Sequence, residues 1–245
     1  MKHYNFKCVN KCEKICCISP TLNEFEKIKH FYDKTPLLLK VSIFNEKYFN
    51  NFIDIFFKQL VMDSLIRVKS LNGFYYINTA FNFSMPGVMC PILKNGMCSA
   101  YEYRPIKCKL FPLQEFLPFS WQYKVLEELK NVCLGIGKGD FLINKSGTKI
   151  NNKAFENYID FWKYAKEWNN FPTILKNIEI LLNHHNEDIE EKASKNMVFE
   201  FVINFKTDET FFNKIDIEEK KYEEKQKELI LNDLNIPQTF KNMFL

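Results

Sequence analysis

The chain has 245 residues, of which 46% are hydrophobic and 26% are charged, and its formal net charge is +4. This balance is typical of a globular protein with one domain, or with one domain and a helical appendage. No dense basic stripe accompanies the weak positive charge, so nucleic acid is excluded as an expected partner. The first residues contain no apolar signal segment, and no stretch has the apolar length of a membrane span. We therefore expect a cytoplasmic protein with no membrane partner.

The first predicted element is a helix that begins at Thr21, where Glu24 completes a capping box, and continues to about Tyr32. The range 42–60 is apolar at mixed spacing and is predicted to be mainly helical. Phenylalanine occurs 25 times in the chain. We expect most of these rings to fill the core rather than to stack on bases.

A β-hairpin is predicted over 65–83. The residues before Asn72-Gly73 alternate in character, that pair is a typical hairpin turn, and 74–77 is rich in strand formers. The next segment, 85–119, contains five prolines. Proline disfavours regular structure, so this segment is predicted to consist of loops, which can position metal ligands.

The C-terminal part is predicted to be mostly helical. The expected helices are 122–131, 153–169, 173–185 and 216–234, with a strand over 197–205. The predicted fold class is therefore α+β, mostly α-helical with a small antiparallel β element and metal-binding cysteine loops. We expect residues 1–140 to form a cysteine-cluster metal-binding domain and 141–245 to form a mainly helical extension packed on it.

The cysteines are the most informative feature of the sequence. All eight lie in the first 133 residues, in two groups of four: Cys8, Cys12, Cys16 and Cys17, and then Cys90, Cys98, Cys108 and Cys133. A reducing compartment keeps thiols free, so we interpret them as ligands rather than as disulfides. Thiolates select zinc, copper(I) or iron–sulfur clusters, and a zinc ion or a cubane cluster takes four of them. The sequence thus predicts two four-ligand sites, or one site with spare thiols nearby.

Adjacent residues usually direct their side chains apart, so Cys16 and Cys17 are not expected to bind the same small ion. Basic residues lie between the cysteines. The lysines are expected to be mostly solvated: Lys7, Lys11, Lys14, Lys107 and Lys109. Arg104 precedes a proline in the second group. Its rigid fork of donors predicts that it braces the loop or supports a ligand from the second shell.

These residues resemble the YkgJ-type cysteine-cluster family, which is described as a zinc- or iron-chelating domain. The similar segments are the first cluster ending at Cys16-Cys17, the Thr21-Leu22-x-x-Phe25 start, 90–98, 99–112 and 133–139. The resemblance implies that all eight cysteines chelate metal. The C-x3-C-x3-C-C spacing is also similar to that of flagellin lysine N-methylases, which are associated with an iron–sulfur cluster. This likeness favours an iron–sulfur cluster over zinc as the cofactor.

Three functions remain open. The first is a metal-binding module, with another protein as a further partner. The second is an iron–sulfur-dependent protein lysine N-methyltransferase, and the third is a zinc-stabilised interaction domain. The glycine-rich stretch Gly135-Ile136-Gly137-Lys138-Gly139 resembles an S-adenosylmethionine loop, but Cys133 rather than a strand leads into it and a strand-like segment follows. We therefore predict a turn there, or a close backbone approach beside the metal site.

Overall fold

The computed structural model describes residues 3–9, 21–22, 38–52, 54–71, 73–82, 90, 93–95, 97–98, 101, 104–204, 221, 224 and 228. The first half contains β1 (His3–Phe6), β2 (Thr21–Leu22), β3 (Leu38–Asn45), the 3-10 helix η3 (Glu46–Asn51), α2 (Ile55–Asp63), β4 (Ile66–Ser70) and β5 (Gly73–Asn82). The second half contains β6 (Leu93–Lys94), β7 (Met97–Cys98), α3 (Ile106–Leu110), η4 (Phe119–Trp121), α4 (Gln122–Leu129), β8 (Asp140–Asn144), α5 (Asn152–Asn169), α6 (Pro172–Lys195) and β9 (Val198–Asn204).

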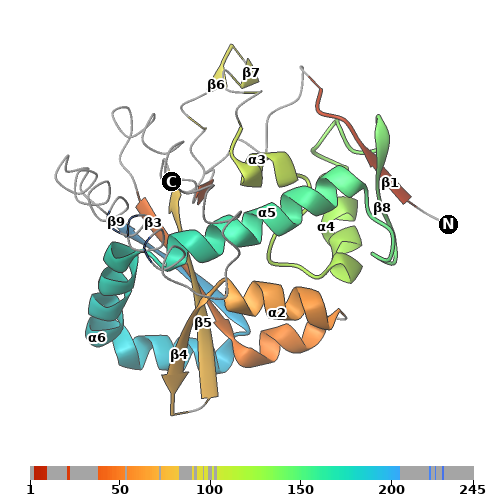
Figure 1. The fold of residues 1–245 in the computed structure, drawn as a ribbon. Coiled ribbons are helices and arrows are strands. Elements are labelled where there is room, and N and C mark those ends of the chain that lie inside the picture. Colours follow the sequence, from red (N-terminus) through yellow and green to blue (C-terminus); the bar gives the residue numbers. More distant parts are fainter. Residues whose placement is uncertain are drawn as a thin grey trace.

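A five-stranded antiparallel sheet organises these elements (Figure 1). Its order is β2-β5-β3-β9, and β4 pairs with β5 on the same edge as β2. Two smaller antiparallel pairs, β1 with β8 and β6 with β7, lie outside it. The α+β class is confirmed. The β1–β8 and β3–β9 pairings both join the range 1–140 to the range 141–245.

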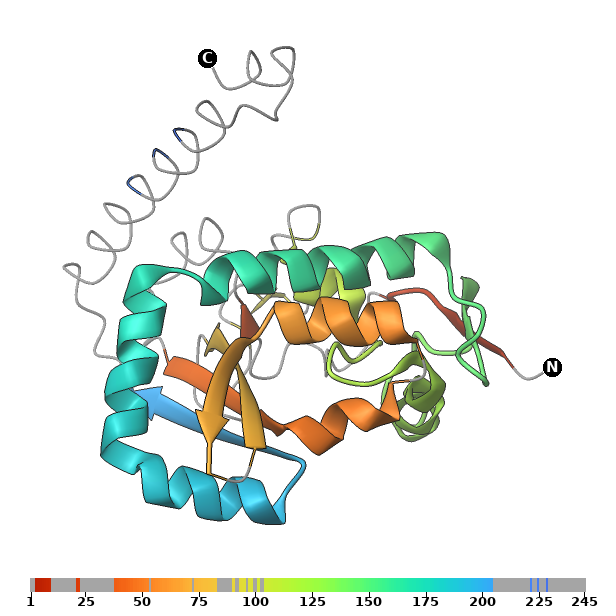
Figure 2. The ribbon, with the colours of Figure 1, turned by 60° about the horizontal axis from the view of Figure 1, so that its bottom comes forward.

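The sheet separates two hydrophobic clusters. On one face, Leu39, Val41 and Ile43 of β3 pack with the apolar side of α6, for example Ile178. On the other face, Phe44 packs with rings and aliphatic side chains from η3, α2, α3, α4 and α5. In Figure 2, α6 follows the left and lower border of the sheet while α2 and α5 lie above it. Many of the described phenylalanines lie in the second cluster, as expected from the composition.

The helix prediction for 42–60 is wrong at its start, because Ser42–Asn45 belong to β3. β3 is paired on both edges and is covered on both faces, so almost all of its residues are buried. A strand buried on both faces loses the strict alternation of apolar and polar residues that identifies a strand in sequence. Only the later part of the range is helical, in η3 and α2.

Most other predicted elements are confirmed. The hairpin is β4–β5, with Ser70 opposite Gly73, and the expected helices 122–131, 153–169 and 173–185 correspond to α4, α5 and α6. The strand over 197–205 is β9. Thr21 lies in β2 rather than at a helix N-cap, and the rest of the range 21–32 lies outside the described residues. Of the expected helix 216–234, only three separate positions are described. Among the described residues, no helix has the length and apolarity needed to cross a membrane.

Asn169, at the end of α5, joins that helix to the sheet through four hydrogen bonds. Its Oδ1 accepts from the Thr79 backbone N–H at 3.0 Å and from the Thr79 hydroxyl at 2.9 Å. Its Nδ2 donates to the Ser64 carbonyl at 2.9 Å and to Asn78 Oδ1 at 3.1 Å. The side chain is only 1% exposed, so water cannot replace these bonds if they are lost.

We expect Asn169→Ala to lower the free energy of unfolding by about 3 kcal/mol, because it leaves several buried polar groups without partners. Urea denaturation followed by circular dichroism measures this loss. The matched control is Asn170→Ala, at the next position but on the exposed side of the helix end, which should change the free energy of unfolding by less than about 0.5 kcal/mol. Equal effects of the two substitutions would contradict the assignment.

Candidate metal centre

Five of the eight cysteines belong to the described residues: Cys8, Cys90, Cys98, Cys108 and Cys133. Cys133 is buried, and the other four are half-buried. The predicted ligands Cys12, Cys16 and Cys17 lie outside the described residues. Within the described part of the chain, no group of three or more histidine, cysteine or acidic side chains is arranged to hold a metal ion.

Cys98 lies on the β6–β7 hairpin, and Cys90 lies just before this hairpin and is hydrogen-bonded to it. Cys98 is paired with Leu93 across the hairpin, and the Leu93 N–H donates to the Cys90 carbonyl at 3.1 Å. Asn95 makes the tight turn with a φ of 50°, a backbone conformation that asparagine tolerates better than most residues. The loop between these two cysteines is thus folded back on itself by its own backbone hydrogen bonds.

Cys108 lies on the short helix α3. Ile106 and Leu110 of this helix are buried in the cluster that includes α5, so the orientation of α3 is fixed by packing. Cys108 itself packs against the other cluster, between the sheet and α6, and Cys90 packs against that same cluster. In the view of Figure 1 the β6–β7 hairpin lies above α3. Cys90 and Cys108 therefore share one hydrophobic environment.

The segment just before Cys8 and the loop after Cys133 are joined by backbone hydrogen bonds. The Lys7 N–H donates to the Gly135 carbonyl at 3.1 Å, and the Gly137 N–H donates to the Asn5 carbonyl at 2.9 Å. β1 and β8 continue this contact side by side in Figure 1. As a result, the first cysteine of the sequence lies beside the segment of the last one.

A side-chain contact reinforces this junction. The Tyr4 hydroxyl of β1 donates to the Glu127 carboxylate of α4, the helix that leads to Cys133. Burial raises the pKa of the Tyr4 hydroxyl well above its usual range, and the hydrogen bond to Glu127 raises this pKa further. The phenol therefore stays protonated and remains a donor at neutral pH.

The glycines after Cys133 allow the close approach predicted from the sequence. A Cβ on Gly135 would lie 2.5 Å from the Lys7 carbonyl oxygen, and a Cβ on Gly139 would lie 2.4 Å from the Lys7 Cβ. Strand β8 begins at Asp140, so this glycine-rich stretch leads into a strand and not into a phosphate-binding helix. The glycines here make room for the segment that carries Cys8.

We expect Gly135→Ala to separate the Cys8 segment from the Cys133 loop, because the new methyl group would collide with a backbone oxygen that cannot move independently. The loss of stability should be about 2 kcal/mol, and metal content should fall with it. Thermal unfolding and metal analysis of the purified variant measure both effects. Gly137→Ala is the control, since a Cβ there meets no atom within 4 Å and only the φ of 86° is strained. Unchanged metal content in Gly135→Ala would contradict this expectation.

Arg104 braces the loop between β7 and α3. Its Nε donates to the Tyr101 carbonyl at 2.9 Å, and its guanidinium carbon lies 3.8 Å from the centre of the Tyr101 ring. This stacked arrangement uses the planar guanidinium in a way that lysine could not. The contact fits the loop-bracing role expected from the sequence. A second-shell role of Arg104 toward a metal ligand stays a prediction.

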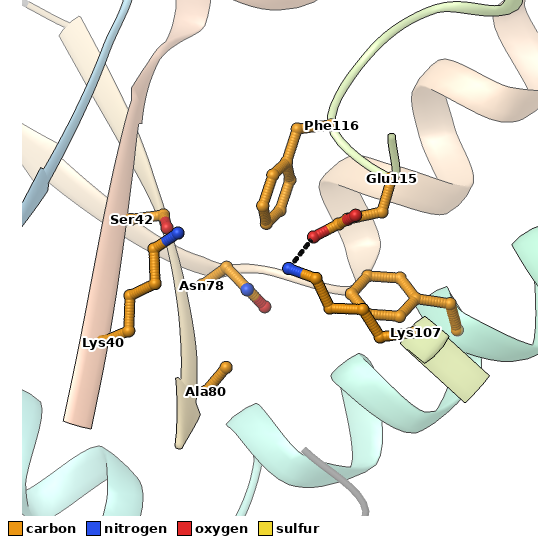
Figure 3. A pocket seen from close by; sticks show the side chains of 8 residues that line it. Lys40, Ser42, Asn78, Ala80, Lys107, Glu115 and Phe116 are labelled. Atoms are coloured by element: carbon orange, nitrogen blue, oxygen red, sulfur yellow. Dashed lines mark ion pairs between the residues drawn. The ribbon is translucent and has the colours of Figure 1, made fainter. Parts of the chain in front are cut away.

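Lys107, next to Cys108, forms an ion pair with Glu115, and the expectation of a solvated lysine is wrong here. Glu115 is only 2% exposed. Figure 3 shows the pair facing Lys40, Ser42 and Asn78 of the sheet across a small polar cavity. At about 10 Å³ this cavity has room for about one water molecule. Sequence reasoning missed the pair, although a single carboxylate inside the apolar run 110–119 is a signal of a buried charge.

The far wall of this cavity is also polar. Lys40 Nζ lies 2.9 Å from Glu200 Oε1 of β9, and the Ser42 hydroxyl donates to the same oxygen at 3.0 Å.

Comparison of the chain with family models, with curated proteins and with solved structures finds no match.

Proposed function

We propose that this protein binds metal through its eight cysteines, with an iron–sulfur cluster as the preferred cofactor and zinc as the alternative. The proposed ligands are Cys8, Cys12, Cys16, Cys17, Cys90, Cys98, Cys108 and Cys133. Soft thiolates in this number are the ligands that both kinds of site use. The preference for iron–sulfur comes from the spacing of the first four cysteines and its resemblance to iron–sulfur proteins.

The proposal is supported by contacts between segments that carry cysteines from distant parts of the sequence. Cys90 is hydrogen-bonded to the hairpin that carries Cys98, and Cys108 packs on the same hydrophobic cluster as Cys90. Cys8 adjoins the segment of Cys133 through backbone hydrogen bonds. These contacts also support a division in which Cys133 shares a site with Cys8 rather than with Cys90.

Metal analysis of protein purified without oxygen tests the proposal. We expect a brown protein with visible absorption and with iron and acid-labile sulfide in stoichiometric amounts. A colourless protein with stoichiometric zinc would replace the cluster by a zinc site. A folded, colourless and metal-free protein would overturn metal binding altogether.

The enzymatic alternative is methyl transfer from S-adenosylmethionine to protein lysines. It rests on the same spacing resemblance. Calorimetric titration with S-adenosylmethionine separates the two readings, because a metal-binding module or a zinc-stabilised interaction domain gives no binding heat with this compound. The glycine-rich stretch that could hold it is used instead for the approach of Lys7, which favours the module.

A further inference from the structure

A second cavity lies away from the described cysteines. It has a volume of about 320 Å³ and opens between the start of α2, η4, the turn after β8 and the first half of α5. The side chains that line it are mainly aromatic: Phe52, Phe57, Phe119, Phe155 and Tyr158. Cavities of this size and composition are suited to small organic ligands, since pockets of about 300–1,000 Å³ usually serve them.

The walls of the cavity are held in place by packing. The rings of Phe57 and Phe119 lie 5.2 Å apart at 80°, and the rings of Phe119 and Tyr158 lie 4.7 Å apart. In the turn after β8, Gly147 lies directly against the Phe119–Ser120 backbone, where an added Cβ would come within 2.3 Å of the Phe119 carbonyl carbon. These contacts fix several of the side chains that line the cavity.

Asp54 supplies the only charge among the described residues that line the cavity. Its Oδ1 accepts from the Phe56 and Phe57 N–H groups at 2.8 and 3.1 Å and so caps α2. The helix terminus contributes about half a positive charge, which leaves a net negative potential at the carboxylate. The cavity therefore favours a cation and disfavours an anion.

The surface beside Asp54 is unusually apolar. Ile55 is 81% exposed and Phe56 is 66% exposed, although both side chains are large and hydrophobic. The Phe56 ring lies 5.7 Å from the ring of Phe57, which lines the cavity.

We propose that this cavity binds a small organic ammonium compound, with its apolar stem among the rings and its charged nitrogen at Asp54. The aromatic rings favour such a cation in two ways, by burying its stem and by attracting its charge where a ring face is turned toward it. A phosphate or carboxylate ligand would find no basic side chain among the described lining residues.

Three compounds with the same stem test the proposal: 3-phenylpropylamine, 3-phenylpropanol and 3-phenylpropionate. Titration of the full chain, labelled with nitrogen-15 and followed by amide shifts, should show the amine binding with a Kd of about 1 mM, as expected for a ligand of this size. The alcohol should bind about fivefold more weakly and the acid more weakly still. The shifts should centre on Phe57, Phe119 and Gly147.

Asp54→Asn is the decisive variant, because asparagine caps a helix as well as aspartate does and only the charge is lost. It should bring the affinity of the amine down to that of the alcohol and leave the affinity of the alcohol unchanged. Asp63→Asn removes the same charge from the other end of α2 and should alter neither affinity. The proposal is overturned if none of the three compounds binds, if the acid binds as well as the amine, or if the preference for the amine survives in Asp54→Asn.

Discussion

Serine in place of Cys90, Cys98 or Cys108 is expected to remove the metal of the site that the replaced cysteine serves and to lower Tm by about 10 °C. A closed site needs four thiolates, and a serine hydroxyl is a poor replacement because it stays protonated at neutral pH. Metal binding by a site that exists only in the folded state adds directly to the free energy of folding. Metal analysis and thermal unfolding under anaerobic conditions measure the two effects on the same sample.

Lys109→Ser is the matched control for this series. Lys109 is exposed and lies next to Cys108 on the same short helix, so its replacement tests the helix without touching a proposed ligand. We expect full metal content and an unchanged Tm in this variant. If Cys98→Ser retains as much metal as the control Lys109→Ser, the hairpin cysteines are not ligands.

The contact between β1 and the loop after Cys133 leads to a further prediction, which concerns Cys8 and Cys133. Cys8→Ser and Cys133→Ser should leave the same residual metal, and the double variant should lose no more than either single variant. Two ligands of one site behave in this way because the first loss already opens the site. Additive losses would instead place Cys8 and Cys133 in separate sites.

The sequence predicted the elements whose pattern is local. α5 has an apolar stripe at helical spacing, and the β4–β5 turn has its Asn72-Gly73 pair. β3 was misread because its burial comes from strands and helices distant in the sequence, which no local pattern reveals. The same limit applied to Thr21, whose capping-box pattern was overridden by pairing with Asn82 of β5.

The candidate site, like the fold, could be predicted from the sequence only in part. Cysteine spacing was enough to propose the ligands, because thiolate chemistry depends on residue type. The contact between the Cys8 segment and Gly135 spans most of the cysteine-rich region and depends on the β1–β8 pairing. The pairing of Lys107 with Glu115 depends on the bend between α3 and η4, and lysines beside cysteines are usually solvated. Such contacts follow from the fold and not from spacing.

The Lys107–Glu115 ion pair gives the second large expected effect. Lys107→Met should lower the free energy of unfolding by about 4 kcal/mol, because it leaves the Glu115 carboxylate buried without its cation. Methionine preserves most of the length and the apolar stem of lysine, so the change isolates the charge. Equilibrium unfolding in urea measures the loss.

Two comparisons separate this electrostatic effect from a packing defect. The double variant Lys107→Met with Glu115→Leu removes both charges and should recover to within about 1 kcal/mol of the parent, since a buried ion pair is often replaced by apolar side chains at little cost. Lys153→Met makes the same substitution in the exposed pair with Glu156 and should cost less than about 0.5 kcal/mol. If the double variant is as unstable as Lys107→Met, the pair acts through the shape of its side chains. If it recovers, the buried charge of Glu115 is what requires a lysine immediately before Cys108.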